Sequence, residues 1–229
     1  MFKYRLTQKC IETILNFETN PTQPKNYLQM KKQLFIFTII ILIFTGCSKD
    51  YELKKSVFIN DKEFPGLPIY SEWGYNTFGA YYDREIFVSN DISVPAKVSV
   101  SNNEMSFILD GQKKPDNYDS HQKMVMTFKI SDFLPEEYTN LTTLNDTILD
   151  LTNSAYQVLI SMDNITYTAN ILSGKLTFKR AQNLLVDKKQ VEVILSGYFE
   201  FKAIINEKTV TVSDGRFDVG ISSDNFYIY

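Results

Sequence analysis

The chain of 229 residues has few of the residue types that build metal centres and disulfide scaffolds: two cysteines, one histidine and one tryptophan. Two cysteines are too few for a disulfide-dense fold or for a zinc site of four cysteines. Basic residues are not in excess, since 24 Lys and Arg stand against 27 Asp and Glu, a net charge of −3. A broad basic surface is therefore not expected, and we predict no nucleic-acid partner.

Recognisable catalytic and metal-binding motifs are also missing. The only histidine, His121, lies in a polar turn, and neither a G-x-S-x-G elbow nor a glycine-rich phosphate loop occurs. Carboxylate pairs such as Glu136–Glu137 are expected by chance in an acidic chain. One loop gathers oxygen donors without the spacing of an EF-hand: Asp110, Asp116, Asn117 and Asp119. We predict no catalytic residue, no metal site and no cofactor.

An export signal is present near the start of the chain. The charged start Met30-Lys31-Lys32 precedes the apolar run 34–44, which is shorter than the ~20 residues of a spanning helix. It ends in Thr45-Gly46-Cys47, which resembles the lipobox of bacterial lipoproteins, with Phe44 where the common pattern has leucine. The resemblance implies that a peptidase cuts before Cys47 and that its sulfur carries diacylglycerol, with palmitate as a typical acyl chain. The alternative is an ordinary buried thiol beside an uncleaved anchor.

This interpretation divides the chain into four parts. Residues 1–29 lie upstream of a start at Met30, a genuine long n-region being the alternative, and residues 30–46 are the signal peptide. Residues 47–56 are the lipidated cysteine and its tether, and residues 57–229 form a single β-rich domain. After cleavage, 18 Lys and Arg stand against 25 Asp and Glu, a net charge of −7. Because Cys47 is consumed by lipid, a hydrophobic core has to stabilise the domain without disulfides.

The tether predicts where the anchored protein faces. Residues 48–55 read Ser-Lys-Asp-Tyr-Glu-Leu-Lys-Lys, which resembles the lysine-plus-acidic signal that sends Bacteroidota lipoproteins to the outer face. A plain flexible linker is the alternative. We expect a lipid-anchored protein of the outer membrane that faces outward, with the membrane as its first partner.

Aromatic residues make up 14% of the chain, and from Val57 onward apolar and polar residues alternate with period two, which is typical of half-buried strands. The clearest strand is 191–205: its odd-numbered residues form an apolar face, and Glu192, Ser196, Glu200 and Lys202 lie on the other. Gly197 predicts a bend or bulge. Further strands are expected at 123–130, 156–160, 165–171, 175–179, 209–213 and 216–219.

Turn residues separate these strands. Asn206-Glu207 predicts a hairpin turn, and Asp214-Gly215 a turn or bulge. Two more hairpins are expected, one joining 57–59 to 62–64 and one joining 75–82 to 85–89. The only helical candidate follows residues 131–132, with residues 135–137 in its first turn. Strands joined by short turns predict an all-β single domain, an antiparallel β-sandwich or a barrel-like sheet.

Both ends of the exported part resemble a known group. Residues 195–201 (L-S-G-Y-F-E-F) and 210–219 (V-T-V-S-D-G-R-F-D-V) are similar to the last strands of an uncharacterised Bacteroidota lipoprotein family, a domain of unknown function with a G-x-F-x-F strand. Residues 58–64 (F-I-N-D-K-E-F) match its first hairpin, with Phe64 where a tryptophan is usual. The resemblance implies a β-rich envelope lipoprotein and brings no catalytic residues.

One segment and one short motif suggest sites. Residues 70–82 are rich in aromatic side chains that could stack on sugar rings, packing in the core being the alternative: Tyr70, Trp73, Tyr75, Tyr81 and Tyr82. Asp146-Thr147-Ile148 resembles the Bacteroidota O-glycosylation motif in a polar loop, with Thr147 as the acceptor. We therefore expect a non-enzymatic surface binding module for a glycan or protein. The alternatives are a carboxylate-dependent carbohydrate hydrolase and a purely structural envelope component.

Overall fold

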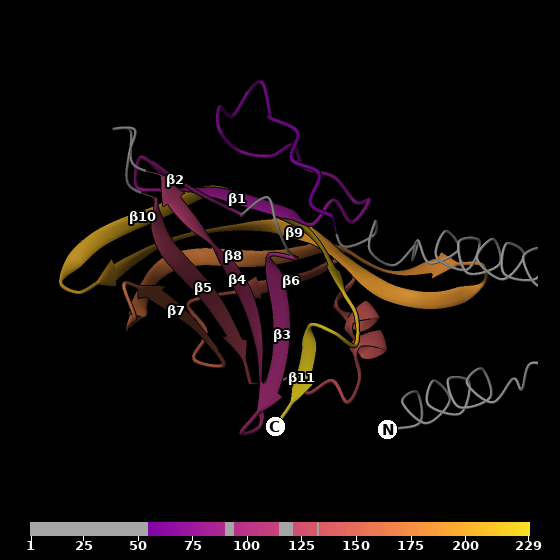
Figure 1. The fold of residues 1–229 in the computed structure, drawn as a ribbon. Coiled ribbons are helices and arrows are strands. Elements are labelled where there is room, and N and C mark those ends of the chain that lie inside the picture. Colours follow the sequence, from indigo (N-terminus) through magenta and orange to yellow (C-terminus); the bar gives the residue numbers. More distant parts are fainter. Residues whose placement is uncertain (1–54, 90–93, 115–120, 132) are drawn as a thin grey trace, which may run out of the picture. The chain divides into compact units, whose positions relative to one another are not determined.

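The computed structural model describes residues 55–89, 94–114, 121–131 and 133–229 (Figure 1). The predicted lipidation site, Cys47, and the predicted signal peptide lie outside these residues. In the described part of the chain, no helix is long and apolar enough to cross a membrane.

The described residues form an all-β single domain with one sheet of eleven strands and one short 3₁₀ helix. The elements are β1 (Thr77–Tyr82), β2 (Glu85–Ser89), β3 (Ala96–Ser101), β4 (Glu104–Lys114), β5 (Gln122–Ile130), η1 (Tyr138–Leu144), β6 (Thr147–Asp150), β7 (Tyr156–Met162), β8 (Ile165–Val186), β9 (Lys189–Ile205), β10 (Lys208–Ile221) and β11 (Phe226–Ile228).

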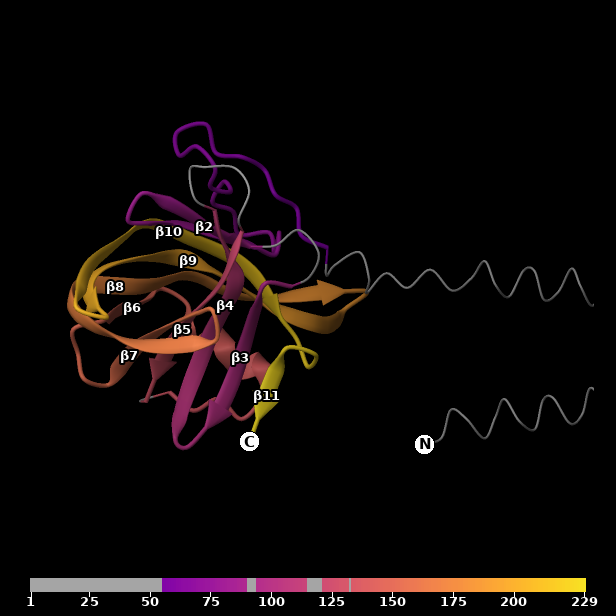
Figure 2. The ribbon, with the colours of Figure 1, turned by 60° about the vertical axis from the view of Figure 1, so that its left-hand side comes forward.

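The sheet closes on itself. Its strands run in the order β4-β2-β1-β10-β9-β8-β7-β5, and β5 pairs with β4 again to complete the ring. All neighbours are antiparallel except β11, which lies parallel to β3 at the margin. Of the two expected architectures, the structure has the barrel-like one, because a sandwich would leave two separate sheets (Figures 1 and 2).

Side chains fill the inside of the closed sheet, as in other small closed sheets. Aromatic rings from facing strands meet there: Phe107 lies 5.1 Å from Phe217 and 5.6 Å from Phe178 between ring centroids. The helix η1 contributes the buried side chains of Leu141 and Leu144 to the same cluster. This cluster is the disulfide-free core that the domain requires.

Local signals predicted two hairpins correctly, and in both of them the turn contains a residue with a positive φ. Asn206 (φ 48°) and Glu207 (φ 64°) form the β9–β10 turn, and Asp83 (φ 57°) opens the β1–β2 turn. Asp214 (φ 54°) and Gly215 form a bulge inside one continuous β10 instead of separating two strands. Asn and Asp tolerate this conformation better than other side chains.

Three expectations were wrong. The two strands expected at 165–171 and 175–179 are one strand, β8, because bulges at Ile171/Ser173 and Phe178/Arg180 absorb the breaks in pattern. The hairpin expected at 57–64 is a looped segment with a single bridge between Asn60 and Pro68. The helical candidate begins later than expected and is the 3₁₀ helix η1.

The long β8–β9 hairpin extends beyond the rest of the closed sheet (Figure 2). The pairing of β8 with β9 shifts register between Phe178 and Arg180, opposite Gly197, where we expected a bend or bulge. A Cβ at Gly197 would come within 1.9 Å of the Thr177 carbonyl oxygen and 2.7 Å of Cζ of Phe217. Gly197 therefore allows β8 and the core ring to approach β9 more closely than any side chain would permit.

Candidate functional site

The predicted aromatic residues separate into two groups in the structure. Tyr82 is buried in the core, where burial raises its pKa to about 12. Tyr81 is half-buried and donates a hydrogen bond to the Pro65 carbonyl over 3.0 Å. Trp73, in contrast, is 77% exposed, and Tyr70 and Tyr75 lie near it, each half-buried. The five residues are therefore not one surface, and Tyr82 in particular is a core residue.

A buried carboxylate fixes the loop that carries Trp73. Asp218 of β10 is 1% exposed and accepts hydrogen bonds from the backbone N–H groups of residues 73–75, at 3.3, 2.8 and 3.0 Å in chain order. The Ser71 hydroxyl donates to the same carboxylate, and the Ser196 hydroxyl does so over 3.2 Å. These donors replace the water that the carboxylate loses on burial. Residues 71–76, the Trp73 loop, are thus held in one conformation.

Further contacts hold the Trp73 loop at both ends. The Gly220 N–H donates to Oδ1 of the buried Asn76 over 2.9 Å. The Gln182 side chain donates to the Glu72 carbonyl over 3.0 Å. Gly74 has a φ of 75°, and a Cβ there would lie 3.2 Å from the Ile194 side chain. Glycine suits this position because the positive φ strains any other residue and a Cβ would press on the Ile194 side chain.

The Trp73 loop covers the first half of the outer face of β9. Glu192 and Ser196, which the alternation places opposite the core, are both buried instead of exposed to solvent. The loop packs over this stretch, with Gly74 beside Ile194 and Glu192. Beyond the loop the same face is exposed from Tyr198 onward. Glu192 and Ser196 lie on the face opposite the core, as expected, but the alternation did not predict that they are buried there.

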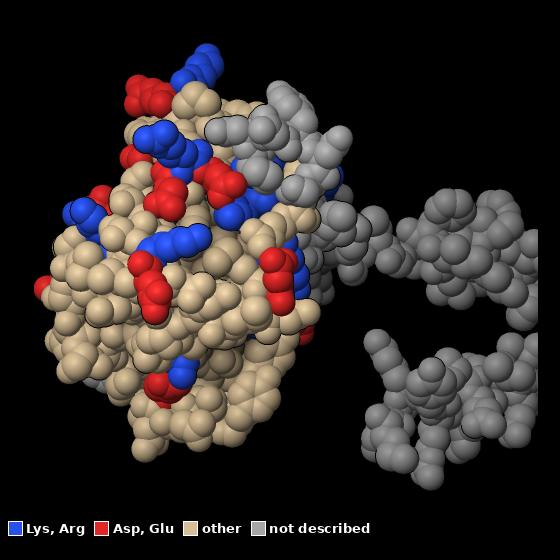
Figure 3. Space-filling model, turned by 90° about the vertical axis from the view of Figure 1, so that its left-hand side faces the viewer, with Lys and Arg blue, Asp and Glu red and all other residues tan. Residues whose placement is uncertain are grey.

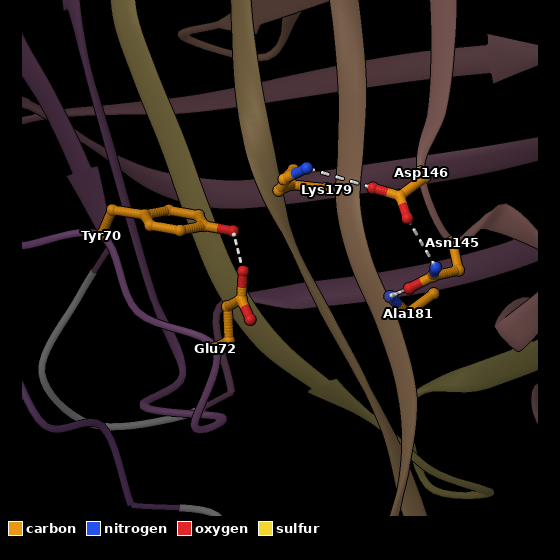
Figure 4. Close-up of polar contacts among 6 residues, drawn as sticks. All are labelled: Tyr70, Glu72, Asn145, Asp146, Lys179 and Ala181. Carbon is orange, nitrogen blue, oxygen red and sulfur yellow. Dashed lines mark hydrogen bonds and ion pairs between the residues drawn. The ribbon is translucent and has the colours of Figure 1, made fainter.

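The predicted residue Tyr70, directly before the loop, pairs with Tyr198 of β9, which was not among the predicted site residues. The Tyr70 ring stacks on Tyr198 with centroids 4.3 Å apart and planes inclined by 25°. The Tyr70 hydroxyl donates to Oε1 of Glu72 over 2.9 Å (Figure 4). Burial and this hydrogen bond raise the pKa of Tyr70, and burial raises the pKa of Tyr198. Both phenols stay neutral donors at ordinary pH.

A groove lies on the outer side of β6, β8, β9 and β10 beyond Tyr198. Its volume is about 570 Å³, and its lining includes Ser173, Gly174, Lys175, Glu200, Lys202, Thr211 and Ser213. The Lys175 ammonium lies 3.1 Å from the Glu200 carboxylate. Asp150, at the same groove, accepts hydrogen bonds from the hydroxyl and backbone N–H of Thr152, which lower its pKa.

Thr147 is the first residue of β6 and pairs with Phe178 of β8. It is half-buried and lies on the same face as the buried Leu149, so its hydroxyl is less accessible than in the polar loop that we expected. The preceding residues form a small polar network: Lys179 contacts Asp146 at 3.2 Å, and Asn145 donates to Asp146 over 3.0 Å (Figure 4). Modification of Thr147 stays a prediction.

The remaining candidates do not gather into a site. His121 is exposed immediately before β5, as expected. Glu137 caps the N-terminus of η1, and Asp110 lies 3.5 Å from Lys123. The described residues contain no group of three or more His, Cys, Asp or Glu side chains that could hold a metal ion. Residues 116–119 of the oxygen-donor loop lie outside the described part.

Comparisons of the chain with protein-family models, with curated proteins and with solved structures found no match. What the site can bind therefore has to follow from its own residues.

Proposed function

We propose that this chain is a lipoprotein of the outer membrane, anchored at Cys47 and facing outward, whose β domain binds a ligand and catalyses no reaction. The charged start, the apolar run and Gly46-Cys47, in that order, support the anchor. Two or more acyl chains hold a protein durably at a membrane. On the face shown in Figure 3, Lys and Arg lie among Asp and Glu, without the single-sign field that attracts nucleic acid.

The exposure of Trp73 carries the binding proposal. An indole that is 77% exposed contributes little to folding, yet its loop is fixed by a buried carboxylate with five hydrogen-bond donors. A rigid, exposed aromatic ring loses little entropy when it binds, and tryptophan is enriched at the centres of binding sites. The flat apolar face of an indole stacks on the C–H face of a sugar ring, so a glycan is the proposed ligand.

The rival hydrolase would need two carboxylates at a defined separation, one of them with a raised pKa as the general acid. The acidic side chains of the groove do not suit that role. The pKa of Asp150 is lowered, and Glu200 is paired with Lys175. These contacts support binding over hydrolysis.

The proposal is tested by screening the full chain, purified in detergent, on glycan and peptide arrays together with Trp73→Ala. The matched control is Tyr229→Ala, which removes another aromatic ring that is 83% exposed. We expect glycan signals that are lost in Trp73→Ala and kept in Tyr229→Ala. Glycan signals that survive Trp73→Ala, or peptide signals alone, contradict the site or the ligand class. Cleavage of a bound glycan would support the hydrolase. Absence of binding on every array would support the purely structural component.

A further inference from the structure

We infer that the binding surface continues from Trp73 along the outer face of β9 into the groove, and that its ligand is an extended, uncharged oligosaccharide. This inference rests on the proposed function. It adds a second subsite and a ligand class to it.

The first step is continuity along β9. Its outward-facing residues are, in order, Ser196, Tyr198, Glu200 and Lys202. Ser196 donates a hydrogen bond to the Asp218 carboxylate, which holds the Trp73 loop. Tyr198 stacks against the Tyr70 ring, and Glu200 and Lys202 line the groove. At ~3.3 Å per strand residue, Ser196 and Lys202 are about 20 Å apart. One sugar ring cannot reach from one end to the other, whereas a chain of several rings can.

The second step is the shape of the groove. Two strands that line it carry bulges: β8 between Ile171 and Ser173, and β10 between Val212 and Gly215. Bulges bend a strand and increase its twist locally. At Gly174 (φ 153°) a Cβ would lie 2.3 Å from Cβ of Phe201 and 2.6 Å from the Glu200 carbonyl oxygen. β8 and β9 therefore approach each other closely at Gly174, and the bulges in β8 and β10 shape the sheet on either side of it.

The third step is the chemistry of the lining. Lys175 and Lys202 are balanced by Asp150 and Glu200, so the charges cancel within the groove. An anionic or cationic ligand would gain attraction from one pair and repulsion from the other. The ammonium groups donate hydrogen bonds, the carboxylates accept them, and the hydroxyls of Ser173, Thr211 and Ser213 do both. These groups suit sugar hydroxyls, and the remaining lining residues Ile148, Phe201 and Val212 offer apolar surface to the C–H faces of sugar rings.

Trp73 makes a direct test possible because it is the only tryptophan in the chain. Its fluorescence reports on ligand contact at one end of the surface, while the length of the ligand probes the other end. Neutral gluco-, manno- and xylo-oligosaccharides, from disaccharide to hexasaccharide, are titrated into the full chain in detergent. Oligogalacturonides serve as the anionic comparison.

We expect the affinity to rise about tenfold or more between disaccharide and hexasaccharide, the equivalent of one or two charge-assisted hydrogen bonds. Lys202→Ala should remove most of this gain and leave disaccharide affinity unchanged. Lys188→Ala, in the exposed β8–β9 turn, is the matched control and should behave like the unaltered chain.

The possible results separate this inference from the proposed function. Affinity that does not depend on length, or a Lys202→Ala loss that is equal at every length, overturns the groove subsite while the Trp73 site stands. Tighter binding of oligogalacturonides overturns the uncharged ligand class. If none of the sugars changes the fluorescence and glycan arrays are also silent, the proposed function fails, and the inference fails with it.

Discussion

A single carboxylate determines whether Trp73 is presented in a fixed position. In the sequence, Asp218 is one polar residue of an alternating strand. In the structure it is buried and accepts hydrogen bonds from the backbone N–H groups of residues 73–75. Ser71, whose hydroxyl also bonds it, is 147 positions away. Alternation in β10 predicts that Asp218 points away from the core. It cannot predict the hydrogen-bond partners of Asp218, because these partners are far away along the chain.

Asp218→Asn should loosen the Trp73 loop. The amide keeps the size of the carboxylate but loses its charge and places an NH₂ donor against other donors. We expect a loss of about 2 kcal/mol in the free energy of unfolding, the cost of weakened bonds to a charged group. Amides of residues 73–75 should also exchange faster. Denaturant unfolding and hydrogen exchange measure the two effects.

The control for this change is Glu207→Gln in the exposed β9–β10 turn, which removes a charge without touching the loop. Equal stability and equal exchange in Asp218→Asn and Glu207→Gln would show that Asp218 does not hold the loop.

Among the elements, β9 shows what period two can and cannot predict. Its odd-numbered residues point inward as expected: Phe199 and Phe201 are buried, and Phe199 packs against Phe128 with ring centroids 5.5 Å apart. The opposite face is mostly polar in the pattern but divided in the structure, because the Trp73 loop covers Glu192, Ile194 and Ser196 and leaves Tyr198 onward open. Alternation identifies two faces and cannot show that a loop lies over part of one.

Phe199→Ala should destabilise the domain by ~3–5 kcal/mol, since it removes a core ring and leaves a cavity. Ile204→Ala, on the partly exposed face of the same strand, should cost about 0.5 kcal/mol. Denaturant unfolding of both variants provides the comparison. Similar losses in the two would mean that the faces of β9 are not assigned as the structure has them.

The architecture of the whole domain depends on pairing between strands far apart in the chain, above all that of β1 with β10, which sets Thr77 opposite Asp218. Together with the local β4–β5 hairpin, this pairing closes the ring and distinguishes a barrel-like sheet from an open one. The turn chemistry of each hairpin is the same in both cases. Closure also removes most of the free edges that a long sheet would expose to pairing with other chains.

The proposed membrane anchor can be tested at the sulfur of Cys47. Cys47→Ala should abolish metabolic labelling with a radioactive palmitate and leave the protein unprocessed or released from the membrane. Cys10→Ala is the matched control, because Cys10 is the only other cysteine and lies upstream of the predicted start at Met30. Labelling that persists in Cys47→Ala contradicts the anchor.

Local order along the chain was enough to predict the all-β class, the inward face of β9, and the turns at residues 83–84 and 206–207. These features depend on neighbours in sequence: alternation determines which side chains need burial, and Asn or Asp accepts the positive φ of a tight turn. Only the tertiary structure decided the closure of the sheet, the burial of Glu192 and Ser196, and the contrast between exposed Trp73 and buried Tyr82. Each of these depends on segments brought together from far apart in the chain, and a local pattern carries no information about which distant segment will cover it.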